Sequence, residues 1–241
     1  MKLHLREWPG GPTLAILLHG LVSDSGSWNS IAPELNRRGY RVLAPDLRGH
    51  GRSPRGSYSV AAWTEDLLES LPTGADLVLG HSLGGVLLAA AVTGLGPSAA
   101  VYEDPAWALP GDQHDLAAMG LRWEGTWSEE EVRAENPRWS DADVQAKVEA
   151  AARWDPATAD GFFTGQDLAL GPDRLAVPSL VLLADPTFLV PAPLQERLTQ
   201  LGFEVVTVPR SGHSIHRDDP QGFLLALDRW LAKRPSPAPL D

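Results

Sequence analysis

The sequence predicts an α/β fold in which a mostly parallel sheet carries helices on both faces. Short apolar runs alternate along the chain with longer segments whose apolar residues recur at helical spacing. Most of the apolar runs are continuous, which is typical of strands that are covered on both faces. Alternating strands and helices imply right-handed crossovers, so functional groups are expected beyond the carboxyl ends of the strands.

The expected elements follow one another along almost the whole chain. Apolar runs predict strands at Leu14–Leu18, Arg41–Ala44, Leu77–Leu79, Ala99–Tyr102, Leu180–Leu183 and Val205–Val208. Helical periodicity predicts helices at about Ser27–Arg38, Val60–Ser70, Leu83–Val92, Pro193–Leu201 and Gln221–Lys233. We expect these elements to form one core, built from residues 1–104 and 172–241.

A long insert, residues 105–171, separates two expected strands and exceeds a simple crossover. Ser128 precedes three glutamates, as at a helix start, and Ser140–Ala152 predicts a second helix with Val144 and Val148 four residues apart. We expect the insert to form a small helical cap over the carboxyl edge of the sheet, within one structural domain. Its tryptophans would form a satellite core and contact the substrate, the expected contacts being Trp107, Trp127 and Trp154.

Composition and charge narrow the possible functions. The chain has 241 residues, no cysteine and a formal net charge of −11. The lack of cysteine excludes disulfides, thiol catalysis and Cys-ligated zinc, and no Lys/Arg-rich run indicates nucleic acid as a partner. Charges within Met1–Glu7 and the short apolar runs argue against a secretory signal or a membrane span, so we expect a soluble cytoplasmic protein. The sequence leaves the oligomeric state open.

The strongest motif is GHSLGG at residues 80–85, which follows an expected strand and opens an expected helix. A G-x-S-x-G nucleophile elbow requires this strand–turn–helix context. The turn forces Ser82 into a strained conformation at the tip of the strand, and the small residues Gly80 and Gly84 let the chain pack closely there. The helix that follows directs its N-terminal N–H groups, beginning with that of Leu83, toward the site.

These residues resemble the α/β-hydrolase superfamily, and the resemblance covers nearly the whole chain. His19 begins a His-Gly turn after the first expected strand, and in the family this turn supplies a second oxyanion donor, here the N–H of Leu21. Residues 46–53, DLRGHGRS, resemble the loop of the family after the next strand. We expect structural roles for the side chains of His19, His50 and His81.

The resemblance identifies His213 as the general base. A Gly-His pair stands in the family between the last strand and the last helix, and Gly212 precedes His213 at that place. Serine is a weak nucleophile until a neighbouring imidazole accepts its proton. His216 completes an H-x-x-H pair, but no cysteine or H-E-x-x-H motif accompanies it, so we expect a supporting or surface residue. No metal and no cofactor are expected.

A catalytic triad also needs an acid that orients the imidazole, and the sequence does not decide which residue supplies it. In most family members it is an Asp after the strand that matches Leu180–Leu183, but here Thr187 occupies that slot. Asp185, two positions earlier, is one replacement. Asp104 follows the preceding strand, where certain lipases, haloalkane dehalogenases and lactonases place their acid. The resemblance favours Asp104, then Asp185, then Glu103.

The resemblance implies a serine hydrolase that cleaves a carboxylic ester or a lactone with an apolar or aromatic group. Ser82 would attack the carbonyl, His213 would take its proton, and the Leu21 and Leu83 N–H groups would bind the oxyanion of the acyl-enzyme pathway. Amide hydrolysis, C–C cleavage and cofactor-free perhydrolysis remain open, whereas Ser82 argues against dehalogenase and epoxide hydrolase chemistry. The alternative is a receptor-like member that binds a small ligand with little turnover. The chain would be a catalytically inactive scaffold only if neither Asp104 nor Asp185 reached His213.

Overall fold

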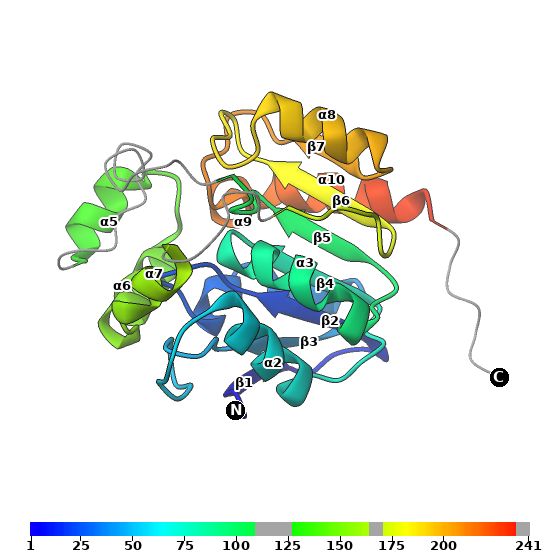
Figure 1. Cartoon of the computed structure of the whole chain (residues 1–241). Coiled ribbons are helices and arrows are strands. Elements are labelled where there is room, and N and C mark those ends of the chain that lie inside the picture. Colours follow the sequence, from blue (N-terminus) through cyan, green and yellow to red (C-terminus); the bar gives the residue numbers. More distant parts are fainter. Residues whose placement is uncertain (109–126, 164–170, 235–241) are drawn as a thin grey trace.

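The computed structural model describes residues 1–108, 127–163 and 171–234. Within these residues, seven strands form one sheet in the order β1-β3-β2-β4-β5-β6-β7 (Figure 1). All neighbouring strands are parallel except β1 and β3. The strands are β1 (Leu5–Trp8), β2 (Thr13–Leu18), β3 (Tyr40–Pro45), β4 (Leu77–His81), β5 (Ala100–Glu103), β6 (Ser179–Leu183) and β7 (Glu204–Thr207).

The mostly parallel sheet confirms the predicted fold class, and each of the six expected strands is present. The sequence reasoning missed β1, which pairs with β3 alone at the edge of the sheet. Its four residues, LREW, are half-buried or exposed. An edge strand of this kind carries no continuous apolar run, so the signal that found the central strands was lacking.

The helices of the core agree with the expected ones except at two places, and one helix of the insert, Ala157–Phe163, was also not predicted. The expected helix at 27–38 is a 3-10 turn followed by a short helix that begins beside Pro33, and a four-residue helix was missed after the expected base. In the core, the helices are η1 (Ser25–Trp28), α1 (Ala32–Arg37), α2 (Val60–Ser70), α3 (Leu83–Leu95), α8 (Ala192–Gln200), α9 (Ile215–Asp218) and α10 (Pro220–Ala232).

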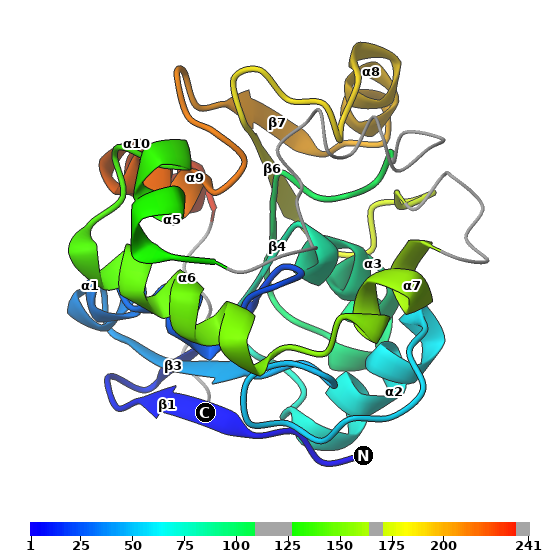
Figure 2. The same ribbon diagram turned by 90° about the vertical axis from the view of Figure 1, so that its left-hand side faces the viewer.

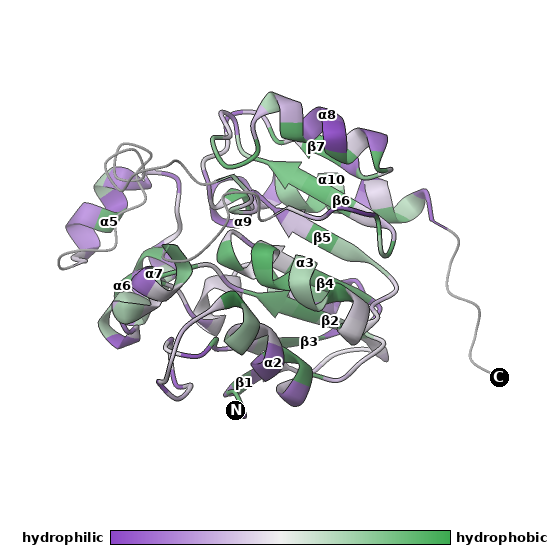
Figure 3. Ribbon diagram, in the orientation of Figure 1, coloured by the Kyte–Doolittle hydropathy of each residue, from purple (hydrophilic) through white to green (hydrophobic). Residues whose placement is uncertain are grey.

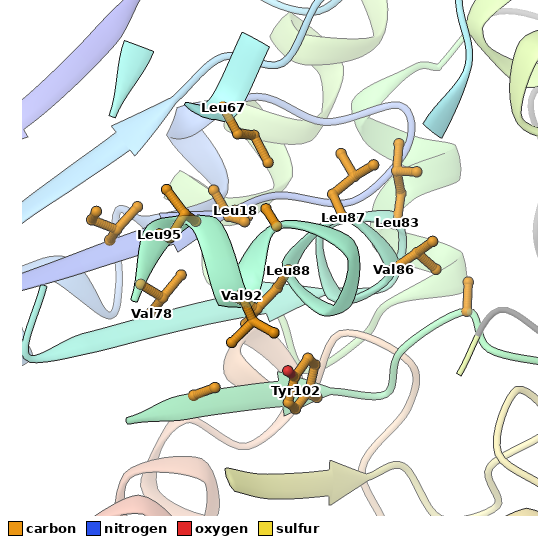
Figure 4. Close-up of a cluster of buried hydrophobic side chains, with 14 of the residues drawn as sticks. Leu18, Leu67, Val78, Leu83, Val86, Leu87, Leu88, Val92, Leu95 and Tyr102 are labelled. Atoms are coloured by element: carbon orange, nitrogen blue, oxygen red, sulfur yellow. The ribbon is translucent and has the colours of Figure 1, made fainter. Parts of the chain in front are cut away.

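The sheet is buried on both faces, as continuous apolar strands require. Ile16 and Leu18 of β2 pack into one core with α2, α3 and α8, whereas Ala15 and Leu17 pack into a second core with α1 and α10. Figure 4 shows Leu87 and other leucines of α3 within the first core. In Figure 3 the central strands are mostly green, the colour of hydrophobic residues, whereas much of the purple lies on the helices and loops outside the sheet. The two cores make the strand ends a rigid base for the site.

Three further helices lie between β5 and β6, beyond the carboxyl ends of the strands (Figures 1 and 2). The Ser128 hydroxyl and the Glu131 carboxylate form a capping box at the start of the first helix, and the Ser140 hydroxyl caps the second. Residues 109–126, which include Trp123 of the insert, lie outside the described residues, as do residues 164–170 and 235–241. The cap boundaries at 105–171 therefore stay a prediction. These helices are α5 (Glu129–Glu135), α6 (Asp141–Arg153) and α7 (Ala157–Phe163).

None of the described helices is long and apolar enough to cross a membrane.

Candidate active site

Ser82 stands at a sharp turn between β4 and α3. Its backbone has φ 53° and ψ −115°, a strained conformation for a residue with a side chain. A Cβ on Gly80 would lie 2.3 Å from the Gly84 carbonyl oxygen, and a Cβ on Gly84 would lie 2.2 Å from the Leu18 carbonyl oxygen. Glycine is therefore required on both sides of the serine for the turn to close.

His213 lies in the loop after β7 and contacts Asp104, the residue that follows β5. Its Nδ1 is 2.7 Å from Asp104 Oδ2. The other carboxylate oxygen, Asp104 Oδ1, accepts hydrogen bonds from the Thr187 hydroxyl at 2.7 Å and from the Ala184 N–H at 3.3 Å. Asp104 has φ +35°, so these bonds hold a strained residue in place. Thr187, which occupies the usual slot of the acid, thus contacts Asp104, the favoured candidate for that role.

The other two candidate acids have different partners. The Asp185 carboxylate accepts the Arg210 N–H at 3.0 Å. Glu103 is fully buried and accepts from His216, with Nδ1 at 2.8 and 2.9 Å from its two oxygens. Of the three carboxylates, the structure therefore brings Asp104 onto the imidazole of His213.

Ser82 and His213 line one cavity of about 550 Å³. No hydrogen bond joins the Ser82 hydroxyl to the imidazole among the described residues, and in unliganded sites this contact commonly tightens only when substrate binds. The polar part of the wall includes Ser23 after β2, Lys147 of α6 and Arg217 of α9. The apolar part includes Leu21, Leu83, Trp127, Phe162 and Phe163.

The two expected oxyanion donors flank Ser82. Leu83 is the first residue of α3, so its N–H lies outside the helical hydrogen-bond ladder and at the positive end of the helix. Leu21 follows Gly20, where a Cβ would come within 3.1 Å of Ser82 Cβ and 2.9 Å of the ring of His81. The lack of a side chain at Gly20 therefore lets the Leu21 segment approach the serine. Both leucines line the cavity.

His19 and His50 are buried away from the cavity and bind backbone groups. The Leu47 N–H donates to His19 Nε2 at 2.9 Å, which leaves Nδ1–H to donate to the Gly20 carbonyl at 2.8 Å. His50 Nδ1 lies 3.1 Å from the Arg48 carbonyl. Burial lowers the pKa of His50 to about 3, so it stays neutral. These contacts support the expected structural roles.

His81, the residue before the serine, contacts the expected base. Its Nε2–H donates to the His213 carbonyl at 3.0 Å, and the two ring centroids are 4.6 Å apart. Burial, and then the positive charge of a protonated His213, hold the pKa of His81 well below its ordinary value. A neutral His81 thus fixes the backbone of the loop that carries His213.

The three tryptophans expected to contact substrate lie in different places. Trp127 lines the cavity. Trp107 instead lies in the sheet core, with its ring 4.9 Å from that of Tyr102, because it follows β5 before the chain leaves the sheet. Trp154 packs in a small cluster with Val22. Other residues of the insert also line the cavity: the aromatic residues Trp139, Phe162 and Phe163, and Lys147, which the sequence reasoning did not name.

The histidines of the H-x-x-H pair face different carboxylates. His213 contacts Asp104 and His216 contacts Glu103. Across residues 1–108, 127–163 and 171–234, no three His, Asp or Glu side chains group as a metal site would require.

Comparison with known proteins places these features in a family. Residues 15–226 match the alpha/beta hydrolase family. The chain is 34% identical over 161 residues to the lipase LipV of Mycobacterium tuberculosis. The aligned segment covers 61% of this chain and 59% of LipV. Among solved structures it resembles an esterase of Exiguobacterium antarcticum, with 15% identity, 95% of each chain covered and a TM-score of 0.74. It also resembles a Bacillus megaterium epoxide hydrolase, with 16% identity, coverage of 95% and 96%, and a TM-score of 0.76.

The matched segments span between 23% and 59% of the length of the first curated relatives. The two structures are too distant in sequence to show more than a common fold.

Proposed function

Because the chain belongs to the alpha/beta hydrolase family, we propose that it is a serine hydrolase that cleaves carboxylic esters through an acyl-enzyme intermediate. In this proposal Ser82 is the nucleophile, His213 the general base and Asp104 the acid of the triad. The observation that carries it is the 2.7 Å contact between His213 Nδ1 and Asp104 Oδ2, beside the cavity that holds the strained Ser82. This contact fixes the tautomer that leaves Nε2 free to accept a proton.

The reaction begins with attack of the Ser82 oxygen on the ester carbonyl carbon while His213 Nε2 takes the hydroxyl proton. The carbonyl oxygen becomes an oxyanion, which the N–H groups of Leu21 and Leu83 stabilise. The intermediate collapses when the imidazolium gives its proton to the departing alkoxide, and the alcohol leaves. Water, deprotonated by His213, then attacks the acyl-serine, and proton return to Ser82 releases the carboxylic acid. Asp104 stabilises the positive imidazolium in both halves.

The wall of the cavity supports an ester with an apolar or aromatic group. Leu21, Leu83, Trp127, Phe162 and Phe163 all line it. Burial of apolar surface favours substrates that fill such a wall. The names of two compared proteins, a lipase and an esterase, support ester cleavage, and a serine at the elbow sets this chain apart from an Asp nucleophile. Lactones are the second substrate class to test.

The test compares hydrolysis of p-nitrophenyl acetate and butyrate by the natural chain and by Ser82→Ala. We expect multiple turnovers by the natural chain and a loss of kcat on the order of 10⁶-fold in Ser82→Ala. A serine-reactive phosphonate should add one adduct, which peptide mass spectrometry should locate on Ser82. Ser57→Ala, at an exposed serine outside the cavity, serves as the matched control and should keep full activity and labelling.

Two results would overturn the proposal. Hydrolysis that survives Ser82→Ala would exclude this serine as the nucleophile. An acyl adduct that forms once on Ser82 and persists would favour the receptor-like alternative, because a receptor retains its product instead of releasing it.

A further inference from the structure

The segment after β2 holds a strained turn beside the proposed nucleophile. Val22 has φ +53°, a conformation that is unfavourable for a β-branched side chain. Its neighbour Leu21 carries an N–H that we assign to the oxyanion hole, and both residues line the cavity that contains Ser82. A strained turn persists only where the surrounding structure holds it. The groups that contact Val22 therefore bear on the oxyanion hole.

Lys147, on the cap helix α6, contacts this turn directly. Its Nζ donates to the Val22 carbonyl oxygen at 2.9 Å. The same ammonium lies 4.3 Å from the ring centroid of Trp127, within the range of a cation–π interaction. Lys147 also lines the cavity. Two directional contacts thus fix a flexible side chain against the peptide that follows the oxyanion donor.

Further bonds on both sides of Lys147 fasten α6 to the same segment. Toward the start of α6, the Asp143 carboxylate accepts from the Ser30 hydroxyl at 2.9 Å. At the end of the helix, Arg153 Nη2 donates to Asp24 Oδ2 at 2.8 Å. Because the helix is held at both ends, the ammonium has a fixed place relative to the turn. Figure 2 shows α6 crossing in front of the sheet, between α5 and α7.

We propose that Lys147 is a positioning residue that holds the Leu21–Val22 turn in the shape that aims the Leu21 N–H at the oxyanion. This inference rests on the proposed function. An oxyanion donor contributes only when it is aimed in advance at the place where charge develops, and loss of a whole donor costs roughly 10²–10³-fold in kcat. Loosening the turn weakens one donor without removing it. The loss therefore falls on the transition state, and binding of the uncharged ester changes little.

The experiment compares Lys147→Met, which keeps the length of the side chain but lacks the ammonium, with Lys233→Met. Lys233 is exposed at the end of α10 and makes a surface ion pair with Glu204, so its variant is the matched control. We expect Lys147→Met to lower kcat for p-nitrophenyl butyrate about 10-fold and to change KM less than about 2-fold. The control should match the natural chain in both.

A pair of inhibitors separates positioning from general damage. A trifluoromethyl ketone adds to the serine and places an oxyanion in the hole, whereas the matched methyl ketone stays trigonal. Lys147→Met should weaken inhibition by the trifluoromethyl ketone about 10-fold and leave inhibition by the methyl ketone within about 2-fold. Lys147→Arg, which retains a charged donor, should restore kcat to within about 3-fold of the natural chain. Lys147→Gln, which is too short to reach the carbonyl, should repeat the methionine result and replaces that variant if it fails to fold.

An unchanged kcat, or an equal loss of affinity for both ketones, would overturn the inference. The Ser82→Ala result judges the proposed function separately. If Ser82→Ala abolishes hydrolysis and the Lys147 variants keep the natural kcat, the positioning role alone fails. If Ser82→Ala stays active, both proposals fail.

Discussion

Two histidine–carboxylate pairs stand next to each other at the carboxyl end of β5, and they differ mainly in exposure. His213 Nδ1 lies 2.7 Å from Asp104, and His216 Nδ1 lies 2.8 and 2.9 Å from the two oxygens of Glu103. The acids are consecutive in sequence and the histidines are three residues apart. Yet the side chain of His213 is 27% exposed, whereas that of His216 is 1% exposed.

The comparison shows that two histidines with the same kind of carboxylate contact can differ widely in exposure. The ring of His216 packs 4.4 Å from Trp28 and 5.3 Å from His81, so neighbouring rings enclose it. Glu103 also accepts the backbone N–H of His216 at 2.8 Å, which ties the start of α9 to the end of β5. We therefore expect the exposed pair to serve the reaction and the enclosed pair to hold the loop between β7 and α10.

The largest expected effect is on the exposed pair. Asp104→Asn should lower kcat about 10³–10⁴-fold, because an amide cannot stabilise the imidazolium and favours the wrong tautomer. The thermal unfolding midpoint should change little by comparison. Steady-state kinetics with p-nitrophenyl butyrate would measure the loss.

Asp185→Asn is the matched control for that variant. Asp185 is exposed, and its carboxylate accepts a hydrogen bond from the Arg210 N–H. We expect kcat to stay within about 3-fold of the natural value, since the amide oxygen can still accept that bond. If Asp185→Asn cost more activity than Asp104→Asn, the assignment of the acid would be wrong.

The enclosed pair should show the reverse pattern in Glu103→Gln. The new amide would face a ring N–H and a backbone N–H with one acceptor oxygen in place of two, and breaking a buried pair is strongly destabilising. We expect the free energy of unfolding to fall by about 3 kcal/mol, measured by urea denaturation. The kcat of the folded fraction should stay within about 5-fold of the natural value.

Glu204→Gln breaks an exposed ion pair with Lys233 and is the control for this comparison. Its free energy of unfolding should change by less than about 1 kcal/mol. A Glu103→Gln variant that kept its stability and lost activity as Asp104→Asn does would mean that the enclosed pair takes part in the reaction.

The sequence was sufficient for the fold wherever the apolar signal was continuous. The buried central strands such as Leu77–His81 and the long helices such as Val60–Ser70 were predicted within a few residues. The edge strand Leu5–Trp8 and the four-residue helix Ile215–Asp218 were not. An edge strand is partly exposed and a single helical turn has no period, so neither leaves a pattern to find.

In the candidate site, too, some residues could be predicted from local sequence and others could not. Local motifs singled out Ser82 and His213, because an elbow and a Gly-His loop are short stretches of sequence. The resemblance favoured Asp104 but left Asp185 open, since β5 and β6 are parallel neighbours whose carboxyl ends reach the same edge. The contact of Lys147 with Val22 spans 125 residues and leaves no local trace.

A third histidine, His81, should make the stability of the protein depend on pH. Burial lowers the pKa of His81 well below 6.5, whereas an unfolded chain would protonate it near pH 6.5. Below that pH the unfolded state binds the extra proton, so this residue contributes stability that is present above pH 6.5 and is lost as the pH falls. At pH 5.5, one unit below the pKa of the unfolded chain, the loss is on the order of 1 kcal/mol.

His81→Gln tests this contribution, because the amide can still donate to the His213 carbonyl but does not titrate. Between pH 7.5 and pH 5.5, the free energy of unfolding from urea denaturation should decrease less in the variant than in the natural chain, by on the order of 1 kcal/mol. A decrease of the same size in both chains would mean that His81 is protonated in the folded protein.

The smallest expected effect concerns the residue that orients the acid of the exposed pair. The Thr187 hydroxyl donates to Asp104 Oδ1 at 2.7 Å, whereas the other oxygen of that carboxylate, Oδ2, faces His213. Thr187→Val keeps the shape of the side chain and removes that bond, so the carboxylate retains the longer bond from the Ala184 N–H alone. Because one of the two bonds that orient Oδ1 remains, we expect kcat to fall about 5-fold, equivalent to about 1 kcal/mol, with KM nearly unchanged.

Thr199→Val, at an exposed threonine on α8, is the matched control and should leave kcat unchanged. Thr187→Ser, which restores the hydroxyl, should recover most of the natural rate. If Thr187→Val kept the natural kcat, the Ala184 N–H and the His213 ring would be enough to orient the strained Asp104. In that case the exposed pair would be held, like the enclosed one, by the backbone and by its own histidine.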